Sequence, residues 1–119
     1  MIQKQTYVSP ADRCGVWWAS VFHLYKGSYR KISFAGDFVK VSIKLTRPQN
    51  WLKKKTKLKG IIIRTKKEIH KIDGSFVRFN NNNVVLLKRR LTPMGKSIYG
   101  PIVKNINRKK FISSFSGVL

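Results

Sequence analysis

Length, composition and charge exclude most classes of protein for this chain. Its 119 residues are enough for one domain with a small hydrophobic core and too few for two. The 26 lysines and arginines outnumber the 4 aspartates and glutamates, which gives a formal net charge of +22 and calls for a polyanionic partner. Because 42% of the residues are hydrophobic and 12% are aromatic, the chain is not a disordered basic tail. We therefore expect a single folded domain, residues 1–119, that binds a polyanion.

The sequence carries no signal for secretion, membrane insertion or disulfide bonding. The longest mostly apolar stretch, residues 16–24, is far shorter than the roughly 20 residues of a membrane-spanning helix. Cys14 is the single cysteine, so it has no disulfide partner within the chain, and this favours a reducing compartment. We expect a soluble protein without a membrane span or a targeting segment.

The first half of the chain predicts short strands. Residues 3–8 and 16–25 are expected to form strands that are joined by a turn at 12–15. Residues 38–45 alternate apolar and polar side chains with period two, which is typical of a half-buried strand with a basic outer face. Pro48 ends this strand.

The second half begins with a lysine-rich loop or ribbon, residues 49–59, and continues into a buried strand that starts at Gly60. The dipeptide Asp73-Gly74 lies between two apolar segments and predicts a β-hairpin with a two-residue turn of positive φ. A second turn at 80–83 precedes a short buried strand at 84–87. Close spacing of short strands and turns favours a mostly β fold, a small closed or nearly closed barrel, with a short basic helix near residues 102–110.

The residues that enzymes use are absent or wrongly spaced. Three of the four acidic residues fall in expected turns, and His23 and His70 have no visible metal co-ligand. The segment Gly95-Lys96-Ser97 imitates the end of a phosphate-binding P-loop, but Arg90 stands where the motif needs its first glycine. We expect no catalytic residue, no metal site and no cofactor.

Basic and aromatic residues are interleaved, as in proteins that bind nucleic acids. Trp17, Trp18 and Trp51 are candidates to stack on bases, as are Phe76 and Phe79, for which core packing is the favoured alternative. In a regular strand Trp17 and Trp18 point to opposite faces, so at least one of them is expected outside the core. Trp51 lies in the lysine-rich loop and is expected to face RNA or a protein partner.

Motifs along nearly the whole chain resemble the universal large-subunit ribosomal protein family numbered fourteen. The segments that carry the resemblance are Met1-Ile2-Gln3-x-Gln5-Thr6, Ala11-Asp12-x-x-Gly15, Gly36-Asp37, Arg64-Thr65-Lys66-Lys67, Asp73-Gly74-Ser75, Arg78-Phe79, Pro93-x-Gly95-x-x-Ile98-x-Gly100-Pro101 and Val118-Leu119. The chain departs from the family pattern at residues 13–34, at the asparagine run 80–83 and at 115–117.

The resemblance implies a structural constituent of the large ribosomal subunit with a closed five-stranded β-barrel, a hairpin extension and a short C-terminal helical or loop region. It implies binding to large-subunit rRNA near the intersubunit face and to small-subunit rRNA across an intersubunit bridge. It also implies contacts with the ribosomal proteins numbered three and nineteen of the large subunit and with a ribosome silencing factor.

Arginine presents a planar donor fork to phosphate, which makes the arginines strong individual candidates for rRNA contacts. The residues expected to bind rRNA are Lys44, Lys53, Lys54, Lys55, Arg64, Lys66, Lys67, Arg78, Arg89, Arg90, Lys96 and Arg108, with Trp51 as a stacking residue.

Two alternatives remain open from the sequence. The first is a free single-strand-binding module of the oligonucleotide-barrel type, which would act outside the ribosome. The second concerns location. Heavy use of Lys, Asn, Ile, Phe and Tyr is typical of an A+T-rich genome, and the chain starts directly at the first strand of the family. These features favour a protein that is encoded in an organelle and works in the mitochondrial matrix, with a cytoplasmic bacterial ribosome as the alternative.

Overall fold

All regular elements in the described part of this computed structural model are β-strands. The structure describes residues 2–12, 14–25, 31–48, 55–88, 100–102 and 117–118. The strands are β1 (Tyr7–Pro10), β2 (Val16–Leu24), β3 (Phe38–Thr46), β4 (Lys57–Arg64), β5 (Ile69–His70), β6 (Phe76–Val77), β7 (Asn83–Leu87), β8 (Pro101–Ile102) and β9 (Gly117–Val118). Within these residues no helix is long and apolar enough to cross a membrane.

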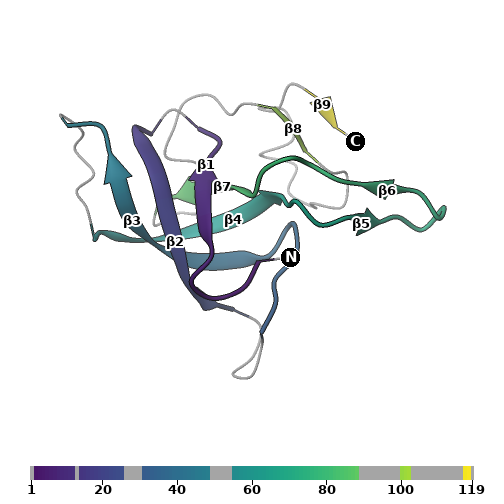
Figure 1. Ribbon diagram of the computed structural model, residues 1–119, viewed down its shortest axis with the longest axis horizontal. Coiled ribbons are helices and arrows are strands. Elements are labelled where there is room, and N and C mark those ends of the chain that lie inside the picture. The colour runs from purple at the N-terminus through teal and green to yellow at the C-terminus, as the bar shows by residue number, and fades with distance from the viewer. Residues whose placement is uncertain are drawn as a thin grey trace.

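Five strands close into a barrel in the order β1-β2-β3-β4-β7. Neighbouring strands are antiparallel, except that β7 pairs with β1 in parallel and so closes the ring. The antiparallel pair β5–β6 is inserted between β4 and β7 and projects from one side of the barrel, away from β2 and β3 (Figure 1). The predicted five-stranded closed barrel with a hairpin extension is confirmed.

Two apolar clusters hold the barrel together. Every barrel strand contributes to the first cluster, which fills the interior and includes the fully buried Ile62 and Leu86. The second cluster lies on the outer side of β4 and β7, where Ile61 and Val85 pack with Ile102 of β8. Residues 60–63 of β4 and 84–87 of β7 are buried on both faces, and these segments are therefore continuous apolar runs rather than alternating ones.

Two β-bulges shape the outer surface of β2. The pairing of β2 with β3 shifts register three times, so that Trp17 and Phe22 are extra residues on β2 and Lys44 is an extra residue on β3. Each bulge leaves two consecutive side chains outside the core, Trp17 with Trp18 and Phe22 with His23. The expectation that at least one of Trp17 and Trp18 lies outside the core is confirmed. Both lie outside it, because the alternation of faces holds only for a regular strand. Both indoles are about half exposed.

The hairpin lies where Asp73-Gly74 predicted it, but its turn is different. The amide of Lys71 donates to the carbonyl of Ser75 (2.8 Å), so the loop contains three residues rather than two. Gly74 alone has a positive φ, of 88°. This is a turn followed by a glycine bulge, the commonest three-residue connection. The carboxylate of Asp73 accepts hydrogen bonds from the amide (3.0 Å) and hydroxyl (2.6 Å) of Ser75 and stabilises the loop.

Other differences from expectation lie at the ends of strands. The chain turns at residues 3–6, where Gln5 has a φ of 69°, so β1 starts at Tyr7 rather than at residue 3. Strand β4 starts at Lys57, within the segment expected to be a loop or ribbon, because it pairs with β3 along that length. Of the expected basic helix, Ile102 belongs to β8, and residues 103–110 lie outside the described residues.

Candidate nucleic-acid interface

The loop that leaves β4 presents two exposed lysines on a fixed backbone. The buried Thr65 donates its hydroxyl to the carbonyl of Lys67 (3.0 Å). The amide of Lys66 donates to the side-chain carbonyl of Asn82 (2.9 Å), which comes from the segment before β7. These bonds hold the backbone while the side chains of Lys66 and Lys67 stay exposed. Asn82 is a positioning residue that the sequence did not single out.

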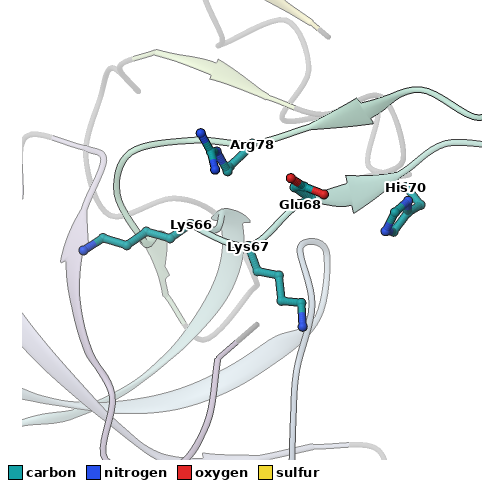
Figure 2. A pocket seen from close by; sticks show the side chains of 5 residues that line it. All are labelled: Lys66, Lys67, Glu68, His70 and Arg78. Atoms are coloured by element: carbon teal, nitrogen blue, oxygen red, sulfur yellow. The ribbon is translucent and has the colours of Figure 1, made fainter.

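Arg78, which follows β6 on the other arm of the hairpin, lies near Lys66 and Lys67. The amide of Phe79, the next residue, donates to the carbonyl of Thr65 (3.2 Å), which holds this segment beside the lysine loop. An open pocket of about 280 Å³ lies between them, and Lys66, Lys67, Glu68, His70 and Arg78 line it. Figure 2 shows the side chains of Lys66 and Lys67 pointing in different directions. This divergence suits several separate phosphates better than one.

Arg64, the last residue of β4, has a partly buried side chain. Its guanidinium lies so close to Gly100 that a β-carbon added to that glycine would lie 2.8 Å from the central carbon of the guanidinium. Burial lowers the pKa of Arg64. Its Nε is buried and has no hydrogen-bond acceptor among the described residues. A bound anion would supply the missing acceptor and offset the desolvation of the cation.

We refer to Arg64, Lys66, Lys67 and Arg78 as the basic edge of the barrel. The structure brings these four predicted site residues together on the segments that flank the hairpin. Lys44 and Lys55 are also exposed but lie at the β3–β4 end, where the amide of Lys55 donates to the carbonyl of Ile43 (2.8 Å). The remaining candidates lie outside the described residues: Lys53, Lys54, Arg89, Arg90, Lys96, Arg108 and Trp51.

A second set of cations lies on the outer face of β4, against aromatic rings. The Nζ of Lys59 is 4.7 Å from the ring centre of Phe38 and 4.9 Å from that of Tyr25. The Nζ of Lys57 is 5.9 Å from the ring centre of Phe22. These cation–π contacts were missed from the sequence, because they depend on the pairing of three strands.

The chain's reactive side chains have structural roles. His23 packs edge-on against Tyr25 (5.0 Å between ring centres), and His70 packs in the same way against Phe76 (5.3 Å). Burial raises the pKa of Cys14 to about 12, with a further contribution from the negative charge of Asp12, so the thiol stays protonated. Within the described ranges no group of three or more His, Cys, Asp or Glu side chains could hold a metal ion.

The chain is similar to known proteins along nearly its whole length. The model of the family described as "Ribosomal protein L14p/L23e" matches residues 1–117. The chain is 57% identical over 117 residues to "Large ribosomal subunit protein uL14m" of Tetrahymena pyriformis, and the match covers 98% of each chain. The chain therefore belongs to the ribosomal protein L14p/L23e family and is a structural, non-enzymatic constituent of the large ribosomal subunit.

Proposed function

We propose that this protein binds large-subunit rRNA through the basic edge, on the side of the large subunit that meets the small subunit. The observation that carries the proposal is the partly buried guanidinium of Arg64, whose Nε lacks an acceptor in the described part of the chain. The exposed Lys66, Lys67 and Arg78 line the open pocket beside the hairpin. A partly buried guanidinium with an unused hydrogen-bond donor is stabilised by a phosphate oxygen that accepts from it.

The mode of binding is contact with several phosphates of a folded RNA. Lys66 and Lys67 point apart, and both are held on a hydrogen-bonded backbone, so each neutralises a different phosphate. Phosphate contacts set position and orientation without reading base sequence. Recognition then depends on the shape of the RNA, because side chains cannot read bases in the deep groove of an RNA helix.

Crosslinking within the assembled particle tests this proposal. Large subunits are irradiated with ultraviolet light, digested, and searched for peptides that carry a nucleotide. We expect crosslinked peptides from residues 64–68 and 78–79. Recovery of these peptides free of RNA, with crosslinks confined to other segments, would overturn the assignment of the basic edge.

The family resemblance supports finer proposals about partners. The protein contacts small-subunit rRNA across an intersubunit bridge, lies beside the ribosomal proteins numbered three and nineteen, and is a docking point for a ribosome silencing factor. Crosslinks to small-subunit rRNA are then expected in whole ribosomes. Whole ribosomes in which the protein crosslinks to large-subunit rRNA alone would contradict the bridge.

We also propose that the protein works in the mitochondrial matrix and is encoded in the organelle. The relative from Tetrahymena pyriformis carries the suffix m in its name, which denotes a mitochondrial ribosomal protein. The lysine- and asparagine-rich composition supports an A+T-rich genome. Sedimentation of purified mitochondria and of cytosol, followed by peptide detection in the large-subunit fractions, tests the location. Finding the coding sequence on a nuclear chromosome would refute organelle encoding.

A further inference from the structure

We propose that the outer surface of β2 and β3 is a second RNA-binding site, which takes unpaired nucleotides by stacking their bases on Trp17 and Trp18. This inference rests on the proposed rRNA binding and adds to it a surface and a class of ligand. The surface, called the aromatic face below, consists of Tyr7, Trp17, Trp18, Phe22 and Leu45, with Lys44 and Lys57 beside them.

The aromatic face exists because of the two β-bulges. Without them, β2 would turn alternate residues inward, and one member of each bulged pair would enter the core. Instead, Trp17 is 47% exposed, Trp18 is 48% exposed and Phe22 is 37% exposed. Trp17 and Trp18 are adjacent in the sequence, and both expose a large apolar ring to solvent. Folded proteins seldom expose apolar patches of this kind unless a partner covers them.

Strand pairing brings the other members to the same side. Leu45 of β3 is the partner of Trp18 and is 38% exposed. Tyr7 of β1 is opposite Ser20, which lies between the two bulges, and is 59% exposed. The small side chain of Ser20 leaves the rings of the two bulged pairs without a bulky residue between them. The result is an outer surface with aromatic rings at both ends of β2.

Charge identifies the partner as an anion. The chain has four acidic residues, and none is exposed on the aromatic face: Asp12 and Asp37 are buried, and Glu68 and Asp73 lie in the segment from the end of β4 to β6. The exposed Lys44 adjoins Leu45, and Lys57 contacts the ring of Phe22. Aromatic rings flanked by lysines, with no acid among them, match single-stranded RNA, which offers both flat bases and phosphates. An acidic protein segment would satisfy the lysines and leave the indoles without a stacking partner.

The aromatic face is separate from the basic edge. β2 and β3 lie on the side of the barrel away from the hairpin β5–β6, which the basic edge flanks (Figure 1). An RNA helix bound at the basic edge and an unpaired segment bound at the aromatic face therefore occupy different sides of the protein, so the two sites can be tested one at a time.

Tryptophan fluorescence of the full chain provides the test. The chain has three tryptophans, and Trp51→Phe leaves Trp17 and Trp18 as the only indoles. This protein is titrated with a 12-nucleotide oligoadenylate, with an RNA duplex of equal length, and with polyglutamate. We expect the single strand to quench the indole fluorescence and the duplex and polyglutamate to leave it nearly unchanged. Equal quenching by polyglutamate would overturn the proposal in favour of an acidic protein partner.

Matched variants separate this proposal from rRNA binding at the basic edge. Trp17→Leu with Trp18→Leu keeps apolar side chains and removes the rings, and we expect about a tenfold or greater loss of affinity for oligoadenylate with duplex binding unchanged. Lys66→Ala with Arg78→Ala should weaken duplex binding and leave the quenching intact. A Trp variant that binds oligoadenylate as tightly as the parent would refute the stacking site, while loss of duplex binding alone bears on the basic edge. Circular dichroism confirms that each variant is folded.

Discussion

The guanidinium of Arg64 lies against the backbone of Gly100, in the space that a β-carbon at that position would take. Gly100 has a φ of 82°, and an added β-carbon would overlap the guanidinium. The last residue of β4 thus packs against the residue that precedes β8, and this contact places a cation at the basic edge. A long-range contact of this kind links barrel stability to the placement of a residue that we propose to bind rRNA.

Gly100→Ala is expected to destabilise the protein by more than Gly74→Ala. Both glycines have φ above 80°, so both substitutions carry the strain of a left-handed residue, about 1–2 kcal/mol. Nothing lies within 4 Å of the β-carbon that Gly74→Ala adds, whereas Gly100→Ala must also displace Arg64. Denaturant unfolding measures both free energies. Equal losses would show that the Arg64 contact costs nothing to move.

Lys66→Ala is expected to weaken assembly into the large subunit only modestly. It removes about one phosphate contact from an interface of many, so the slope of log affinity against log salt falls by about one. Lys66→Arg keeps the charge and should behave like the parent. Glu68→Gln removes a negative charge beside the same pocket and should tighten binding. Complete loss of incorporation from Lys66→Ala alone would contradict a distributed interface.

Asn82→Ala is expected to loosen the lysine loop. Its side-chain carbonyl accepts the amide of Lys66, and loss of an exposed hydrogen bond of this kind costs about 0.5–1.5 kcal/mol. Amide hydrogen exchange at Lys66 should accelerate, while exchange in the barrel strands stays the same. Asn81→Ala, an exposed neighbour in the same run, is the control. Unchanged exchange at Lys66 would show that the bond does not hold the loop.

The two isoleucines Ile62 and Ile72 should differ sharply in their response to truncation. Ile62 is fully buried in the barrel interior, and Ile62→Ala should cost about 2–5 kcal/mol of unfolding free energy. Ile72 is fully exposed at the hairpin tip, and Ile72→Ala should change stability by less than about 0.5 kcal/mol. Thermal unfolding of the two variants checks both values.

Cys14 should make the protein less stable at alkaline pH. Its pKa is raised from 9.0 to about 12 in the folded state, so above pH 9 the unfolded chain loses the thiol proton while the folded chain keeps it. The contribution of the Cys14 thiol to the free energy of unfolding is fully present below pH 9, and it is lost as the pH rises toward 12. The difference in unfolding midpoint between the parent and Cys14→Ala, measured from pH 7 to 10.5, should shift in favour of the variant. A constant difference would refute the raised pKa.

Local sequence predicted the elements whose signals are local. Period-two alternation located β3, and Asp73-Gly74 located the hairpin, because both depend on residues within one segment. The bulges of β2 could not be predicted, since an extra residue is defined only by pairing with β3. The start of β4 at Lys57 has the same cause: the partner strand extends the ladder into a lysine-rich segment.

The sequence predicted which residues make up the candidate site, but it predicted only part of their arrangement in space. Family motifs pointed to Arg64, Lys66 and Arg78, and these residues do come together at one edge. The contact with Gly100 and the hydrogen bond from Lys66 to Asn82 join distant parts of the chain, so no local pattern reports them. The partial burial of the Arg64 side chain also depends on the folded chain, so the sequence could not predict it.

The parallel pairing of β1 with β7 has a consequence for folding during synthesis. Ser9 is opposite Asn83, whose side-chain amide donates to the hydroxyl (2.7 Å) and carbonyl (3.2 Å) of Ser9. A nascent chain must therefore be translated beyond Leu87 before its first strand finds a permanent neighbour on that side. Until then the barrel is an open sheet with an unpaired edge and an incomplete core, and contacts of such long sequence separation form slowly. Translation intermediates that end before Asn83 should depend on chaperones or on RNA to stay soluble.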